Sequence, residues 1–277
     1  MNLRTIPVGM VGIDNNSMKA YLAIMAKQGI RPRTIIYLKT QIEGVKFNLL
    51  KSILGVKLAK HLYMIKKYYK LRAYKKFSQF FSNEISVGKL FLSPPDYAKS
   101  CQFYSEIETN DINDPRVAEA LRNSGEQVFI YGGGGIVKAG LFDLNIKFLH
   151  THPGYLPYVR GSHGIYWSLL VRGKFGCTTF YMNQGIDTGA IIKAKEYDIS
   201  TFTMPAVDVV MADKLMFFFI DPLLRAMTLI DVLTKHDGFS NIDSCPQDNS
   251  LGEAFYTMHP KLRFKIVKRM LPVPSLP

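Results

Sequence analysis

The sequence predicts an α/β fold in which a mostly parallel, Rossmann-like sheet is flanked by helices. The first indication is a β-α-β pattern, with a buried-strand run at 6–13, an amphipathic helical run at 18–28 and a second strand run at 33–38. A second unit has a helical pattern at 113–124 and a strand pattern at 127–131. The chain has 277 residues, of which 47% are hydrophobic, enough for one large core with additions.

The first strand-to-helix turn, Asp14–Ser17, offers helix-capping side chains, and Gly29 ends the helix. This turn lacks Gly-x-Gly-x-x-Gly, so the sequence predicts no nucleotide cofactor there. The strand at 127–131 leads into Gly132–Gly135 and Ile136, without the Gly-Lys-Ser/Thr of a Walker loop. Two interpretations stay open for these glycines: a pocket that needs close backbone approach, and a plain flexible turn.

Two histidines follow the alternating strand pattern at 145–149. His150 and His152 are two residues apart and should project from one face of the strand, which a Pro-Gly pair then ends. Because ligands of open α/β sheets bind outside the carboxyl ends of strands, these histidines indicate a functional site. His-x-His with a distant Asp187 is also how several metal sites begin, although no third clustered ligand follows.

Three motifs follow one another along this part of the chain. They read His-Thr-His-Pro-Gly-Tyr-Leu-Pro-Tyr-Val-Arg-Gly at 150–161, Gly-Cys-Thr at 176–178 and Asn-Gln-Gly-Ile-Asp-Thr-Gly-Ala-Ile at 183–191. An ordered set is far more specific than one short motif. It resembles the signature of the folate-dependent formyltransferases, which include the glycinamide ribonucleotide, methionyl-tRNA and sugar N-formyltransferases. The resemblance implies the formyltransferase fold and formyl transfer from N10-formyltetrahydrofolate to a primary amine.

The resemblance also implies three catalytic residues. His152 matches the family histidine that handles the proton of the amine, and Asp187 matches the aspartate that fixes this histidine. His150 stands where the family has an asparagine that holds the oxyanion. A ring N–H can fill that role, but a histidine is expected to make it pH-dependent.

Binding residues are implied as well. Two loops are expected to line the folate pocket, with Gly132, Gly133, Gly134, Gly135, Ile136, Gly185 and Ile186. The turn after the histidines is expected to bind the substrate, through Arg160, Gly161 and His163. For His163 an ordinary solvated loop position stays open. No metal cofactor is expected.

We predict a formyltransferase-like catalytic domain at 1–200, a basic helical insertion at about 41–93 and a mainly helical extension at 201–277. The stretch 51–76 holds nine Lys or Arg residues and no acidic residue, in a chain of net charge +13. Packing on the sheet, contact with an anionic membrane, and binding of nucleic acid or a phosphorylated substrate all stay open for it.

The extension at 201–277 continues with a long helical pattern at 206–235 and holds no second catalytic constellation. A tRNA formyltransferase would be expected to carry a β-rich module here. Sugar N-formyltransferases carry such extensions for substrate or dimer contacts. The resemblance alone therefore implies a nucleotide-linked amino sugar as acceptor rather than tRNA, and it is compatible with a homodimer. Two alternatives remain: a hydrolase, either deformylase-like or metal-dependent through His150 and His152, and a non-catalytic basic binding module.

The composition indicates the cellular compartment in which we expect the protein. Three separated cysteines without a Cys-x-x-Cys pair predict neither a disulfide framework nor a zinc site, and they fit a reducing cytoplasm. No apolar stretch reaches the roughly 18 residues that span a bilayer. We therefore expect a cytoplasmic protein that contacts membranes at most peripherally.

Overall fold

A computed structural model of the chain describes residues 3–40, 49, 51–55, 57, 58, 62, 96–202, 204, 206–235, 239 and 242–271. Most of the basic insertion predicted at 41–93 lies outside these residues, so the roles considered for it stay predictions. Among the described residues, no helix is both long enough and apolar enough to cross a membrane.

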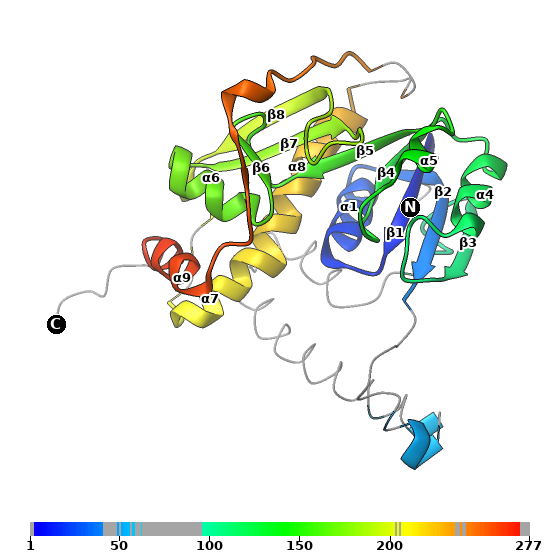
Figure 1. Cartoon of the computed structure of the whole chain (residues 1–277), viewed down its shortest axis with the longest axis horizontal. Coiled ribbons are helices and arrows are strands. Elements are labelled where there is room, and N and C mark those ends of the chain that lie inside the picture. The colour runs from blue at the N-terminus through cyan, green and yellow to red at the C-terminus, as the bar shows by residue number, and fades with distance from the viewer. Residues whose placement is uncertain are drawn as a thin grey trace.

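The centre of the fold is a seven-stranded sheet with the order β3-β2-β1-β4-β5-β7-β8 (Figure 1). Its strands are β1 (Arg4–Ile13), β2 (Ile30–Lys39), β3 (Phe103–Glu108), β4 (Val128–Tyr131), β5 (Lys147–His152), β7 (Phe175–Tyr181) and β8 (Ile191–Tyr197). The first five pair in parallel, whereas β7 runs antiparallel to both β5 and β8. The predicted mostly parallel sheet is confirmed.

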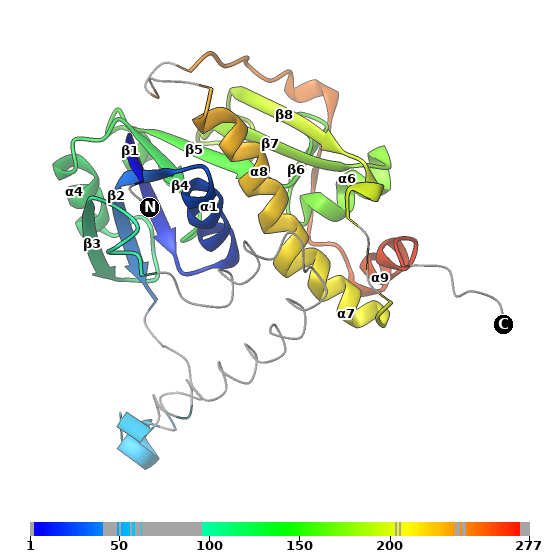
Figure 2. The ribbon, with the colours of Figure 1, turned by 180° about the vertical axis from the view of Figure 1, so that it is seen from behind.

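Helices cover both faces of this sheet (Figure 2). They are α1 (Asn16–Lys27), α4 (Pro115–Asn123), α5 (Ala139–Phe142), α6 (Gly164–Arg172), α7 (Val209–Leu215), α8 (Asp221–Leu233) and α9 (Pro260–Lys268). The long helix predicted at 206–235 is confirmed as α7, a π-helical turn at Met216–Ile220, and α8. π-Turns of this kind are frequent at functional sites.

The two faces of the sheet build two separate apolar cores. On β1, Val8 and Met10 are buried in the larger core with α1 and α8, whereas Val11 is buried in the core that α4 and α5 cover. A parallel strand covered on both faces needs apolar residues at successive positions. This explains why residues 6–13 show a nearly continuous apolar run.

After α8 the chain returns to the sheet as a largely extended stretch, residues 242–258, here called the C-terminal segment. It forms β9 (Glu253–Phe255), which pairs in parallel with β6 (Val159–Gly161), and it leads into α9. In Figure 1 this orange to red stretch passes β8 and β6 before α9. The extension thus packs against the turn that follows the two histidines.

Glu126 provides a first test of this packing, because its carboxylate is buried between β2 and β4. It accepts two hydrogen bonds from Arg33, at 2.7 and 2.8 Å, and one from the Thr34 hydroxyl at 2.9 Å. We expect Glu126→Gln to lower the free energy of unfolding by about 1–3 kcal/mol in urea denaturation. The control Glu106→Gln removes an exposed pair with Lys39 and should leave the urea midpoint nearly unchanged. Equal effects of both variants would contradict the assignment.

Candidate active site

The two histidines lie within β5 rather than beyond its end. His150 is opposite Phe180 of β7, and His152 is opposite Thr178. The strand predicted at 145–149 therefore starts two residues later, at Lys147, and continues through both histidines because β7 pairs with it there. Both side chains belong to the same face of the sheet, as their spacing of two predicts.

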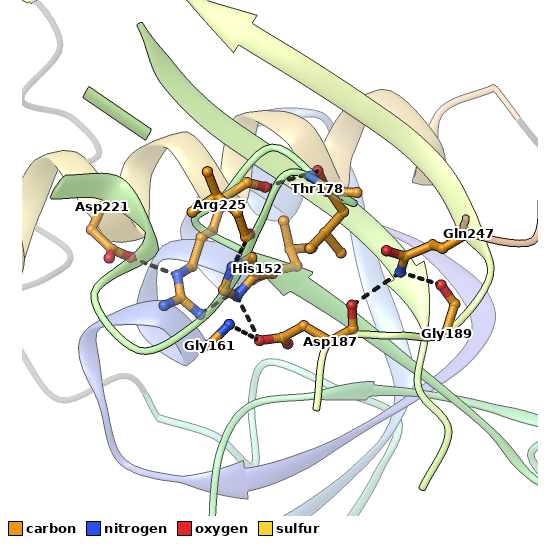
Figure 3. Close-up of polar contacts among 12 residues, drawn as sticks. His152, Gly161, Thr178, Asp187, Gly189, Asp221, Arg225 and Gln247 are labelled. Atoms are coloured by element: carbon orange, nitrogen blue, oxygen red, sulfur yellow. Dashed lines mark hydrogen bonds and ion pairs between the residues drawn. The ribbon is translucent and has the colours of Figure 1, made fainter. Parts of the chain in front are cut away.

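His152 and Asp187 form a close pair (Figure 3). The ring Nδ1 lies 3.3 Å from Asp187 Oδ2, and the backbone N–H of Gly161 donates to the same oxygen at 2.9 Å. Asp187 has a φ of +53°, in the left-handed region that aspartate tolerates better than most residues. The sharp turn at Asp187 brings its carboxylate back toward β5.

The other ring nitrogen of His152, Nε2, lies 3.0 Å from the backbone carbonyl of Val159. The ring is fixed closely, because a Cβ at Gly154 would come within 2.4 Å of Nε2 and one at Gly164 within 2.9 Å. Glycine is thus required at Gly154. The Thr178 hydroxyl stabilises this turn by donating to the Gly154 carbonyl at 2.9 Å and accepting from the Leu156 N–H at 3.1 Å.

His150 packs edge-on against Tyr131 and Phe180, with ring centroids 5.4 and 5.7 Å away. Its Nδ1 is buried and has no hydrogen-bond partner among the described residues. Burial, together with the positive charge of Arg225, lowers the pKa of His150 to about 3. The expectation that His150 makes the site pH-dependent near neutrality is therefore wrong, because this imidazole stays neutral in that range.

The charge states of the other two residues follow from the same environment. Burial lowers the pKa of His152, against the opposing effect of Asp187. Burial opposes ionisation of Asp187, but the Gly161 N–H and the positive charge of Arg225 favour the carboxylate, and the pKa of the carboxyl lies below the ordinary value. Near neutral pH the site thus contains a neutral His152 beside an Asp187 carboxylate.

A carbonyl oxygen can only accept a hydrogen bond, so the contact with Val159 places the His152 proton on Nε2. In the neutral ring, Nδ1 then carries a lone pair and faces a carboxylate oxygen at 3.3 Å. Two acceptors face each other at this position. The pair therefore offers two lone pairs to a cation that lies between them.

Two side chains that support the site have no counterpart in the sequence motifs (Figure 3). Arg225 of α8 donates to the carbonyl of Thr151, between the two histidines, at 3.2 Å and pairs with Asp221 at 2.5 Å. Gln247 of the C-terminal segment donates to the carbonyls of Asp187 and Gly189, at 3.1 and 2.5 Å. An Asp-x-x-x-Arg spacing within an apolar helix is a usable signal for Arg225, whereas nothing in the sequence indicates Gln247.

The predicted substrate-binding side chains lie against the C-terminal segment. Arg160 is buried and donates to the backbone and side-chain oxygens of Asn249 and to the carbonyl of Gly252. His163, half-buried with a φ of +57°, accepts a hydrogen bond from the Met258 N–H at 2.9 Å. These contacts hold the segment in place, and substrate contacts of Arg160, Gly161 and His163 stay a prediction.

The two predicted pocket loops present backbone and apolar side chains to their surroundings. Gly133, Gly134 and Gly135 all have positive φ values, and a Cβ at Gly135 would meet no atom within 4 Å. Ile136 is 72% exposed and Ile186 63% exposed, so both side chains are accessible to a ligand.

A cavity of about 350 Å³ lies at the amino end of α1. It is lined by Asn15, Asn16, Ser17, Phe217, Phe218, Asp221, Pro222 and Arg225. Arg225 therefore links this cavity to the strand that carries the two histidines. The amino end of a helix favours an anionic group.

Part of the chain is similar to known proteins. Residues 107–210 match the family model described as formyl transferase. This range contains His150, His152, Asp187 and the glycine loop, but neither Arg225 nor Gln247.

Curated relatives match over part of their length. A methionyl-tRNA formyltransferase of Syntrophus aciditrophicus is 28% identical over 168 residues, which are 59% of this chain and 51% of that protein. One of Ruminiclostridium cellulolyticum is 30% identical over 118 residues, 41% of this chain and 38% of that protein. The chain thus matches about half, or less, of the length of these relatives. Among solved structures, a sugar N-formyltransferase of Shewanella sp. aligns with 94% of this chain and 87% of that chain, at 15% identity and a TM-score of 0.46.

Proposed function

This chain carries a formyl transferase family segment at residues 107–210, and on that premise we propose that it transfers a formyl group from N10-formyltetrahydrofolate to a primary amine. The observation that carries the proposal is the pairing of the buried His152 with the half-buried Asp187 inside the matched segment. In this reaction the amine nitrogen bonds to the formyl carbon, the bond from that carbon to the donor nitrogen breaks, the amine loses a proton and the donor nitrogen gains one.

The chain's own residues supply the acid-base chemistry. Because Nε2 of His152 is held by Val159, the amine proton moves to Nδ1. There it lies between the ring and Asp187 Oδ2, so the carboxylate stabilises the imidazolium that forms. His150 Nδ1 has no protein partner, and in the Nδ1–H tautomer it donates to the formyl oxygen as negative charge develops there.

The formyl donor fits the loops beside this site. N10-formyltetrahydrofolate supplies the carbon that the amine attacks. The open space beside Gly135 lets a flat ring approach the backbone, and the exposed Ile136 and Ile186 offer apolar surface to it. Gly132, Gly133, Gly134 and Gly185 complete the backbone of the two loops that we assign to donor binding.

For the acceptor we propose an amino sugar linked to a nucleotide. One feature supports it: the cavity at the amino end of α1, where the helix end favours a phosphate. Arg225 also lines this cavity, but it is paired there with Asp221. The described part of the C-terminal extension consists of the helices α7, α8 and α9 and, between α8 and α9, the extended C-terminal segment with β9. Methionyl-tRNA remains the competing acceptor, since the curated relatives are methionyl-tRNA formyltransferases.

The deciding experiment incubates the purified full chain with N10-formyltetrahydrofolate and one acceptor at a time. The acceptors are a nucleotide-linked amino sugar, methionyl-tRNA and no amine, with product mass and tetrahydrofolate release as readouts. We expect a formamide on the sugar nucleotide. Formylated methionyl-tRNA would overturn the choice of acceptor, and formate release without amine would favour the deformylase alternative.

Gln247 offers a test of how the C-terminal segment supports the site. Removing its amide leaves the carbonyls of Asp187 and Gly189 without a donor, so the turn that aims the carboxylate loosens. We expect Gln247→Ala to lower kcat on the order of 10-fold with little change in KM for either substrate, because small displacements of a positioned group cost rate. The control is Gln102→Ala, an exposed glutamine just before β3 and outside the site, and equal rates in the two variants would contradict the role.

A further inference from the structure

The hydrogen-bond pattern around His152 is the one found at metal-binding histidines. One ring nitrogen donates to a backbone carbonyl, that of Val159, and the other presents its lone pair to a carboxylate oxygen. Metal-ligating imidazoles usually donate their second N–H in this way, which fixes the tautomer and aims the free nitrogen at the ion.

His150 adds a second imidazole with a free nitrogen. Its Nδ1 is buried without a partner among the described residues. With the proton on Nε2, Nδ1 carries a lone pair that can bind an ion, whereas the Nδ1–H tautomer is the one that donates to the formyl oxygen in the proposed reaction. One donor atom each from His150, His152 and Asp187 lie within 4.8 Å of one another, which is wider than the about 3.3 Å between two ligands of one tetrahedral ion, so these side chains must rotate toward a shared ion.

We propose that His150, His152 and Asp187 form a binding site for a divalent transition-metal ion, with Zn²⁺ as the probe. Two ligands on a tetrahedral zinc ion, each about 2.0–2.1 Å from it, lie about 3.3 Å apart. The His152 Nδ1 to Asp187 Oδ2 distance is 3.3 Å. Two imidazoles and a carboxylate are a zinc-ligand set that leaves a fourth position open. The charge of the nearby Arg225 is offset by its ion pair with Asp221.

A bound ion and the proton of the acceptor amine compete for the lone pair on His152 Nδ1. This consequence rests on the proposed function: an ion on His152 Nδ1 removes the proton acceptor, so occupancy inhibits formyl transfer. The proposed metal site also replaces the expectation that no metal binds. That expectation rested on the spacing of residues in the sequence and not on the lone pairs in the folded site.

The test titrates chelator-treated full-length protein with Zn²⁺ by calorimetry and with Co²⁺ by visible absorption. We expect one ion per chain and the absorption bands of a four-coordinate Co²⁺ site with nitrogen and oxygen ligands. His150→Asn should weaken binding on the order of 100-fold or more, since loss of even an outer partner costs about 10–100-fold. Asp187→Asn should weaken it similarly.

The matched control is His259→Asn, the same replacement at the exposed cap of α9, where asparagine also caps a helix. It should bind Zn²⁺ as the unaltered chain does. No binding of one ion per chain, or equal affinity in His150→Asn, would overturn the proposal. Formyl transfer by the metal-free protein is measured separately. If the metal-free protein transfers formyl groups but binds no Zn²⁺, the proposed function holds and the metal site is rejected. If it binds Zn²⁺ but transfers no formyl group, the metal site holds and the proposed function is rejected.

Discussion

Replacing His152 with alanine is expected to lower formyl transfer by at least about 100-fold while the protein stays folded. A positioned general base typically contributes about 10²–10⁴ in rate. His152 is the residue whose free nitrogen lies against the Asp187 carboxylate, so its loss removes the acceptor of the amine proton. The measurement is kcat and KM for both substrates in chelator-treated protein, with circular dichroism to check the fold.

Replacing Asp187 is also expected to lower formyl transfer, but for a different reason. Asp187→Asn keeps the size of the side chain and the oxygen that accepts from Gly161, but it removes the charge that stabilises imidazolium at His152. We expect a loss of similar size in kcat, and less than additive losses in the double variant, because the two residues act on one proton. The control His259→Ala removes an exposed histidine and should retain full activity. Near-normal rates in either site variant would refute the assignment.

Local patterns were sufficient to predict the frame of the site. The spacing of two between His150 and His152 placed them on one strand face, and the apolar runs predicted β1, β2 and β4 within a few residues of their ends. These signals are local because side-chain alternation and buried strands are properties of short segments.

The charge states of the site residues, and the side chains that support them, could be found only from the folded structure. The low pKa of His150 depends on Arg225, which lies 75 positions later on α8, and the position of Asp187 depends on Gln247. Neither partner follows from periodicity. The roles of Arg160 and His163 show the same limit, since both contact a segment about 90 residues farther along the chain.

Buried His150 is also expected to make stability fall in acid. Its pKa is about 6.5 ordinarily and about 3 in the folded protein. As the pH falls below 6.5, the unfolded chain takes up a proton that the folded protein does not. Stability is therefore complete above pH 6.5 and is lost progressively as the pH falls toward 3.

His150→Asn removes this titration and keeps a polar side chain of smaller size. We expect the free energy of unfolding of the unaltered chain to drop by about 2 kcal/mol more than that of His150→Asn between pH 7 and pH 4. This is less than the full shift implies, because part of the residue remains accessible. Urea denaturation at several pH values in metal-free buffer measures it, and His259→Asn should follow the unaltered chain. Parallel curves for the unaltered chain and His150→Asn would mean that His150 titrates normally in the folded protein, and its neutral state in the proposed mechanism would then be wrong.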